Sequence, residues 1–307
     1  MGLDINGTRF IFYAKKAGVN YSKTAMIGRQ TLHLKPAELQ KNLTEFGYSS
    51  DKNVIHSIFN GDDGSSEQLF RYLGADVIES FDNSSYEGAT HIYDMNQEIP
   101  DTFKERYSVV LDGGSLEHIF NFPVAIKNCM EMVEVGGHYL GITPTNNLVG
   151  HGFYQLSPEL YYSVFTIENG YKIIDVIAYE THNKKWFSVN SPLSIGRRVT
   201  LVNKNPTYLL VIAKRVEKKT IFESPPQQSD YAAAWKQEGS ALPTEIDPKL
   251  GIVNSIKINF SKNISRLIKN TKRITSKLTG KRHYSGFDPS YFVPIEPAKM
   301  HSSNKNE

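Results

Sequence analysis

The sequence predicts an α/β fold built on a doubly wound, mainly parallel sheet of seven strands. Short apolar segments alternate with helical patterns along residues 24–215, and strands separated by helices form βαβ units with parallel strands. No clear helix separates the last two segments, so an antiparallel strand is expected at one edge. The chain has 307 residues, 39% of them apolar, enough to bury a sizeable core.

The first predicted strand, 24–28, is short and apolar and ends in Gly28. About fifty residues separate Gly28 from the next strand, so the first crossover is enlarged. The elements expected in this half of the sheet are a strand over 24–28, helices over 35–46 and 65–74, and strands over 75–82 and 89–96.

The second half of the predicted sheet begins with YSVVLDGG, an apolar strand that runs into Asp112, Gly113 and Gly114. A helix follows over 121–137 and stops at Gly136 and Gly137, as helices often stop at glycine. Ser157 and Pro158 are typical of a helix start. The remaining expected elements are a strand over 138–144, a helix over 157–170, and strands over 171–180 and 207–215.

Composition divides the chain into four parts. Residues 1–216 form the α/β domain, and 217–250, rich in Ser, Pro, Gln and Asp, form a linker. Residues 251–285 form a basic, amphipathic helical extension, and 286–307 form a tail whose aromatics return to the core. Residues 251–283 contain nine Lys or Arg and no acid. This extension is expected either on an anionic membrane surface or docked on the α/β domain.

Charge and composition narrow the cellular setting. The net charge is only +3 and no series of aromatics accompanies the basic residues, so nucleic acid is not an expected partner. One cysteine, no secretory signal and no apolar run long enough to span a membrane favour a cytoplasmic protein. Because of the basic extension, peripheral association with the inner face of the membrane is a further expectation.

Ligands of such sheets bind at the carboxyl ends of the strands, where this chain places Asp82, Asp94 and Asp112. Three acids suit a ligand with ribose hydroxyls, an adenine amine and a positive centre; alternatively, each acid caps a following turn. The first loop, MIGRQTL, has one glycine and lacks the G-x-G-x-x-G of dinucleotide sites, which argues against a nicotinamide cofactor.

Residues 107–144 resemble the second half of class I S-adenosylmethionine-dependent methyltransferases. Leu116-Glu117-His118 matches that family's helix start, and Val135-Gly136-Gly137 matches its glycine turn before the next strand. The resemblance extends over about 24–215 and is closest to methyltransferase-like proteins of bacterial surface-glycan assembly. It implies a Rossmann-like fold and S-adenosyl-L-methionine as cofactor.

The resemblance also implies a cofactor site. Gly28 marks its first loop, Asp82 binds the ribose, and Asp94 and Met95 lie at the adenine. Asp112 and Gly113 line the methionine end. Arg29 either binds the cofactor's carboxylate or blocks the loop. The implied cofactor-binding residues are Gly28, Arg29, Asp82, Asp94, Met95, Asp112 and Gly113.

Methyl transfer to a hydroxyl needs a base, and histidine supplies one near neutral pH. His151, in a glycine-flanked loop, is the first candidate and His118 the second, and the alternative for each is a structural hydrogen bond. No metal site is expected, because Glu117 and His118 alone do not make one. The expected acceptor-binding residues are Asn146, Asn147, Tyr154 and Gln155.

The resemblance implies a methyltransferase and, together with the basic extension, it favours an oxygen of a sugar or glycan precursor as the acceptor. The alternative is a non-catalytic binding or scaffold protein with the same fold at a membrane surface. A nicotinamide-dependent oxidoreductase is the least favoured of the three.

Overall fold

The computed structural model describes residues 2–60, 64–232 and 286–299. Within them, a short parallel pair, β1 (Gly2–Leu3) and β3 (Thr31–Leu32), lies apart from one large sheet. The strands of the large sheet are β2 (Lys23–Ile27), β4 (Val77–Asp82), β5 (His91–Ile92), β6 (Tyr107–Asp112), β7 (Val133–Asn146), β8 (Tyr171–Glu180), β9 (Trp186–Val189), β10 (Thr207–Arg215) and β11 (Phe292–Ile295).

Neighbouring strands of the large sheet follow the order β11-β9-β8-β10-β7-β6-β2-β4-β5. The five strands from β7 to β5 pair in parallel. β10 is antiparallel to β7 and β8, β9 is antiparallel to β8, and β11 is antiparallel to β9. All strands except β9 and β10 therefore point the same way, which confirms a mainly parallel sheet.

The prediction was wrong on two features of this sheet. The described residues form nine strands in it, not seven. The antiparallel strand β10 lies between β7 and β8 and not at an edge, because its backbone forms ladders with both neighbours. β9 and β11 are four-residue strands that extend the sheet beyond β8.

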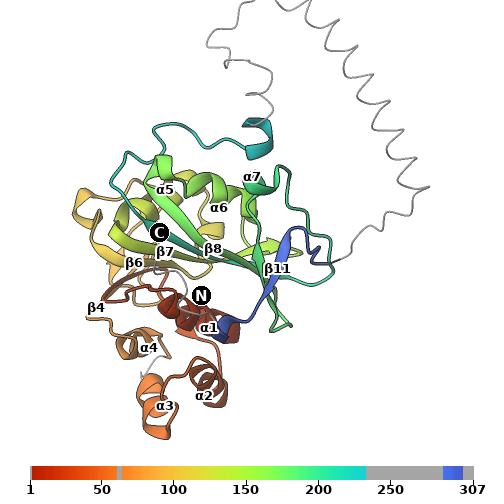
Figure 1. The fold of residues 1–307 in the computed structure, drawn as a ribbon. Helices are drawn as coiled ribbons and strands as arrows, with labels where there is room; N and C mark the ends of the chain where they lie inside the picture. The colour runs from red at the N-terminus through yellow and green to blue at the C-terminus, as the bar shows by residue number, and fades with distance from the viewer. Residues whose placement is uncertain (1, 61–63, 233–285, 300–307) are drawn as a thin grey trace, which may run out of the picture.

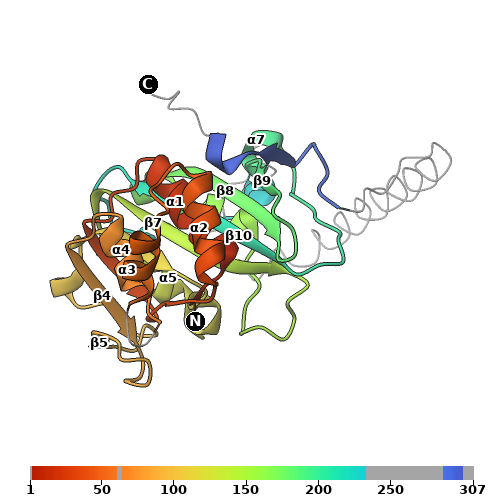
Figure 2. The ribbon, with the colours of Figure 1, turned by 90° about the horizontal axis from the view of Figure 1, so that it is seen from below.

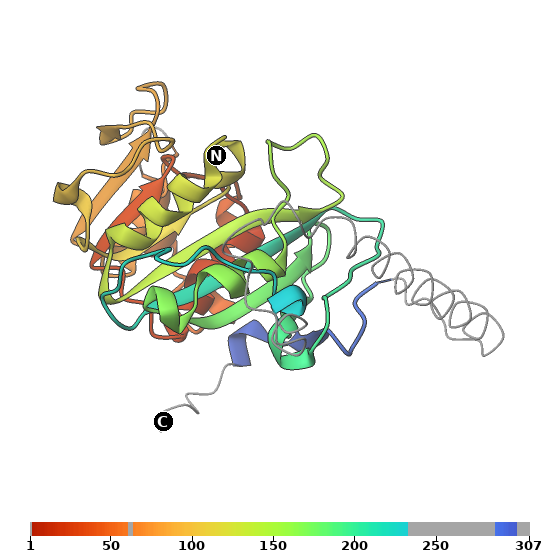
Figure 3. The same cartoon turned by 90° about the horizontal axis from the view of Figure 1, so that it is seen from above.

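Helices cover both faces of the sheet, as Figure 1 shows. Side chains alternate along each strand, so Ala25 and Ile27 join the core under the helices of residues 122–164, whereas Met26 joins the core under the helices of residues 5–72. Figures 2 and 3 show the two helical layers from below and from above. The helices are α1 (Ile5–Lys16), α2 (Pro36–Glu45), α3 (Lys52–Phe59), α4 (Glu67–Tyr72), α5 (Phe122–Met132), α6 (Pro158–Val164) and α7 (Pro192–Ile195), with 3₁₀ turns η1 (Asp101–Phe103), η2 (Leu116–His118), η3 (Ile167–Asn169) and η4 (Pro297–Lys299).

The helix α5 ends at Met132, so the predicted stop at Gly136 and Gly137 was wrong. Both glycines lie inside β7. Gly136 has a φ of +92°, and a Cβ on Gly137 would lie 2.8 Å from the carbonyl oxygen of Ser108 on β6. Gly137 therefore lets β7 approach β6 closely, where the register between the two strands shifts, and Gly136 supplies a backbone conformation that favours glycine.

The helix α1 was not predicted, although Asp4 caps it by accepting a hydrogen bond from the Gly7 amide. Nine of its 12 residues are buried against the sheet and α2. The enlarged first crossover is confirmed, since α2, α3 and α4 all lie between β2 and β4. Ser157 caps α6, as its sequence indicates, by accepting from the Leu160 amide.

The C-terminal aromatics return to the core as expected. Phe287 stacks on Phe187 with ring centroids 4.1 Å apart, and Phe292 on β11 is buried. The sheet thus includes residues beyond the expected boundary at 216 (Figure 1). The predicted basic helix over 251–285 lies outside the described residues. Among the described residues, no helix has the length and apolar character needed to cross a membrane.

Candidate active site at the carboxyl edge of the sheet

A pocket of about 370 Å³ opens where the parallel strands end. The chain leaves β2 for β4 on one side and later returns to β6 on the other, so the pocket lies at the switch point of the sheet. Five of the residues singled out from the sequence line this pocket: Gly28, Asp82, Asp94, Met95 and His118.

The two pocket carboxylates are partly engaged by their own loops. Asp82 Oδ1 accepts from the Ser84 amide at 3.0 Å, and its Oδ2 has no hydrogen-bond partner among the described residues. Asp94 Oδ1 accepts from the backbone and side-chain nitrogens of Asn96 at 2.9 and 2.7 Å, which lowers the pKa of Asp94. Asp82 therefore keeps an oxygen for a ligand, and Asp94 stays ionised in the pocket.

The first loop is held tightly across three strands. Gly28 has a φ of +69°, and its amide donates to the Phe81 carbonyl of β4 at 2.7 Å. From the other side, the Ser115 hydroxyl donates to the Ile27 carbonyl. The turn at Gly28 thus forms a fixed wall of the pocket, in a conformation that favours glycine.

Asp112 and Gly113, expected at the methionine end of a cofactor, do not line the pocket. Asp112 is fully buried, and its carboxylate accepts from the amides of Ser115 and Leu116 and from the Tyr139 hydroxyl. Burial raises the pKa of Asp112 despite these bonds. Asp112 thus caps its own turn, the alternative that the sequence left open.

The side chain of Gln30 occupies the space beside Gly113. A Cβ on Gly113 would lie 2.3 Å from Gln30 Oε1. The Gln30 amide nitrogen donates to the carbonyls of Ile27 and Gly28, while Oε1 is buried without a hydrogen-bond partner. Gln30 therefore fills the space beside Gly113 and, like Gly113, does not line the pocket.

Arg29, the remaining expected cofactor residue, also lies outside the pocket lining. Its guanidinium forms an ion pair with Glu67 at 2.7 Å and donates to the Glu87 carbonyl at 3.1 Å. These contacts tie the first loop to α4 and to the loop after β4. Arg29 does not line the pocket in this arrangement, and its contact with a cofactor carboxylate stays a prediction.

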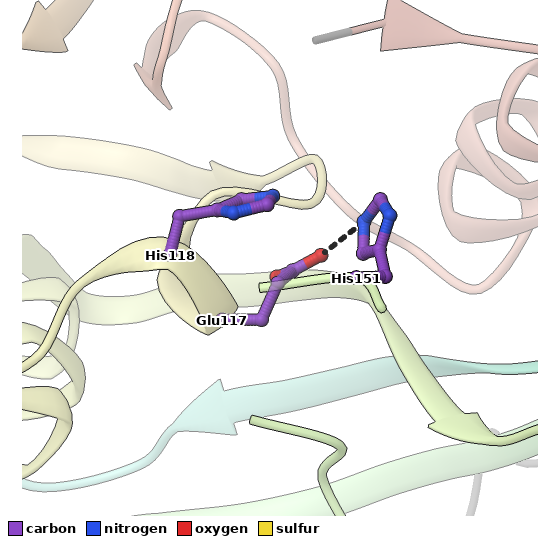
Figure 4. A group of neighbouring side chains, drawn as sticks. All are labelled: Glu117, His118 and His151. Atoms are coloured by element: carbon purple, nitrogen blue, oxygen red, sulfur yellow. Dashed lines mark ion pairs between the residues drawn. The ribbon is translucent and has the colours of Figure 1, made fainter. Parts of the chain in front are cut away.

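The structure brings Glu117, His118 and His151 together, as Figure 4 shows, and His118 places this cluster at the edge of the pocket. Their ligand-type atoms all lie within 4.8 Å of one another, and Glu117 Oε1 is 3.4 Å from His151 Nε2. Glu117 is fully buried. Its burial and the nearby Asp112 raise the pKa of Glu117, and burial and His151 lower the pKa of His118. His118 lines the pocket, whereas His151 does not.

The loop that bears His151 is fastened by the residues expected to bind an acceptor. Asn146 and Asn147 donate to Asn203, and Asn147 also donates to the Asn205 carbonyl. Tyr154 donates to the Phe120 carbonyl at 2.6 Å, and Gln155 Oε1 accepts from the Leu148 amide at 2.9 Å. None of these four lines the pocket, so here they shape the loop.

Sequence reasoning gave Glu117 and Gln30 no site role. Two signals were present: Glu117 lies directly beside a candidate histidine, and Gln30 stands in the first loop, where the resemblance implies small residues. Neither signal reveals that Glu117 is buried without a hydrogen-bond partner or that Gln30 lies over Gly113.

No family model matches the chain, and no curated protein is significantly similar to it. Solved structures are similar at low identity. A branched-chain polyamine synthase mutein from Thermus thermophilus with 5'-methylthioadenosine gives 10% identity, TM-score 0.36 and coverage of 73% of this chain and 60% of that chain. TehB from Haemophilus influenzae gives 13% identity, a TM-score of 0.34 and coverage of 66% of this chain and 61% of that chain. The 1,6-didemethyltoxoflavin-N1-methyltransferase of Burkholderia thailandensis with S-adenosylhomocysteine gives 10% identity, a TM-score of 0.38 and coverage of 69% of this chain and 78% of that chain.

The match spans less than two thirds of the Thermus and Haemophilus chains. TM-scores of 0.34 to 0.38 assign neither a family nor an activity to this chain.

Proposed function

We propose that this chain binds S-adenosylmethionine in the pocket at the ends of β2, β4 and β5 and transfers its methyl group to an acceptor oxygen. The supporting observation is the convergence of Gly28, Asp82, Asp94 and Met95 from three strand ends on one cavity. Its volume, about 370 Å³, is within the usual range of ligand pockets.

The pocket residues suit the nucleoside part of this cofactor. Asp82 Oδ2 is available to accept from a ribose hydroxyl, and the buried Met95 offers an apolar surface to a base. The bound cofactor supplies a methyl group on a positively charged sulfur, and the ionised Asp94 favours a positive ligand over an anionic one. Gln30 fills the space beside Gly113, where the resemblance implies the amino-acid part of the cofactor, and its side chain is fully buried.

The acceptor in this proposal is a sugar or glycan hydroxyl. Its proton has to leave during transfer, and the cluster of Glu117, His118 and His151 offers bases at the pocket edge. The basic segment 251–285 would keep the chain at an anionic membrane surface, near a membrane-bound precursor.

Binding of S-adenosylhomocysteine, followed by calorimetry, tests the cofactor. We expect a micromolar Kd for the native chain and at least a tenfold weaker one for Asp82→Asn, a loss of about 1.4 kcal/mol. Asp101→Asn is the matched control, because Asp101 lies on η1 with a side chain 95% exposed. Absence of binding, or equal binding by Asp82→Asn, contradicts the proposal.

A second candidate, a non-catalytic binding protein on the same fold, is favoured by the position of Gln30. If the native chain fails to bind S-adenosylhomocysteine and Gln30→Ala binds it, the first loop closes the site and this candidate replaces the first. Sedimentation with anionic liposomes, with and without residues 251–283, tests its membrane contact: equal sedimentation would contradict that contact.

A further inference from the structure

Two imidazoles and one carboxylate meet at the edge of the pocket, from η2 and from the loop after β7 (Figure 4). Two histidines and one acid form the donor set of several catalytic zinc sites, which leave a fourth position open. We propose that Glu117, His118 and His151 bind a first-row divalent cation such as Zn²⁺. The sequence does not reveal this site, because His151 lies 33 residues beyond His118.

The distance between Glu117 and His151 fits two ligands of one ion. Their closest atoms are 3.4 Å apart, whereas a charge-assisted hydrogen bond between such groups measures about 2.7–2.9 Å. Two ligands bonded to a tetrahedral zinc at about 2.0–2.2 Å lie about 3.3–3.6 Å from each other. The observed spacing therefore leaves room for a cation between the two side chains.

The burial of Glu117 points to a missing positive partner. The residue is fully buried, and neither carboxylate oxygen has a hydrogen-bond partner in the part of the chain that the structure describes. Buried carboxylates are normally paired, hydrogen-bonded or bound to metal. The two imidazoles are its neighbours, with ring centroids 5.1 Å apart, and neutral imidazoles are metal ligands.

The backbone holds the donors in place before any ion binds. The Glu117 carbonyl accepts from the amides of Phe153 and Tyr154 at 2.8 and 3.3 Å. Gly152 packs on Glu117 so closely that a Cβ there would lie 2.7 Å from the Glu117 carbonyl oxygen. His118 is exposed and His151 is half-buried, so rotation of their side chains can close spacings of up to 4.8 Å to the distance between ligands.

A cation here would adjoin the ligand pocket, because His118 belongs to both. It would lower the pKa of an acceptor hydroxyl that reaches it, which gives the reaction a way to lose the proton without a free histidine base. The inference goes beyond the proposed methyl transfer, and metal binding is measured with no methyl donor present.

Zinc titration of the untagged, chelator-treated full chain followed by calorimetry tests the site. We expect one Zn²⁺ per chain with a micromolar or tighter Kd, and at least tenfold weaker binding by His151→Gln and by Glu117→Gln. His182→Gln is the matched control, since His182 is an exposed histidine in the turn after β8, and its affinity should equal that of the native chain.

Absence of stoichiometric zinc binding by the native chain would overturn the proposal and leave a histidine and carboxylate cluster without metal. Equal affinity of the native chain and His151→Gln would also overturn it, by placing the zinc elsewhere. If Glu117→Gln does not fold, His151→Gln still decides, because His151 has a side chain 41% exposed and its replacement leaves the core intact. Failure of S-adenosylhomocysteine binding with intact zinc binding would refute the proposed function alone.

Discussion

Gly113→Ala should be strongly destabilising, and the main cause should be the Gln30 side chain. The added Cβ would lie 2.3, 2.5 and 2.9 Å from three atoms of the Gln30 amide, below the 3.0 Å that real Cβ atoms keep. Gly113 is not among the described residues with positive φ, so alanine adds no backbone strain there. Gln30 is fully buried and has to move.

The expected cost has two parts. Overpacking in a filled core costs about 1–3 kcal/mol. Displacing the Gln30 amide also breaks its bonds to the Ile27 and Gly28 carbonyls, at about 1 kcal/mol each. We expect a loss of about 3 kcal/mol in the free energy of unfolding. In a Gln30→Ala background, where the amide is gone, the same change should cost less than about 1 kcal/mol.

Urea denaturation of the native chain, the two single variants and the double variant measures this coupling. The expected coupling is about 2 kcal/mol, larger than the error with which independent substitutions add. If Gly113→Ala costs the same with and without Gln30, or costs nothing in the native background, the close approach of these two residues is refuted.

Three further predictions concern other parts of the fold. Burial lowers the pKa of His138 to about 4 from 6.5, so between these values the unfolded chain takes up a proton that the folded chain refuses. The free energy of unfolding should thus fall by up to about 3 kcal/mol from pH 7 to pH 4. Urea titrations of His138→Gln should lack this loss. Equal pH dependence of the variant and the native chain would contradict the lowered pKa of His138. Gly152→Ala should displace the loop and weaken zinc binding at least tenfold, because Gly152 has a φ of +74° and the added Cβ would lie 2.7 Å from the Glu117 carbonyl oxygen. An unchanged zinc Kd would show that the loop does not position His151. Phe292→Ala should lower the free energy of unfolding by about 3–5 kcal/mol, because Phe292 is 2% exposed in the core. A loss below about 1 kcal/mol would show that β11 is not part of the folded sheet.

The strands that the sequence predicted most accurately are those with long apolar runs. The expected strands at 171–180 and 207–215 agree with β8 and β10 at both ends. Apolar runs and β-branched residues suffice for such segments, because β10 and the second half of β8 are largely buried and their composition carries the strand signal. The antiparallel direction of β10 also follows from the missing crossover helix.

The elements that were missed depend on distant partners. β9 has four residues after a polar turn, and it is a strand because β8 and β11 flank it. The helix α1 contains Gly7, Thr8 and several aromatics, which favour helix weakly, and it is stabilised by burial against the sheet. The glycines of β7 have the pattern of a helix stop, but contact with the Ser108 carbonyl explains the need for Gly137.

The sequence by itself placed Gly28, Asp82 and Asp94 together, because the ends of parallel strands share one edge and this rule needs no side-chain detail. The tertiary structure alone decided which polar groups are already paired. In the folded chain Arg29 pairs with Glu67, Asp112 caps its own turn, and His151 lies next to Glu117. Pairing and burial depend on atoms that are remote along the chain. The local sequence pattern therefore cannot distinguish a carboxylate that caps a turn from a buried carboxylate without a hydrogen-bond partner.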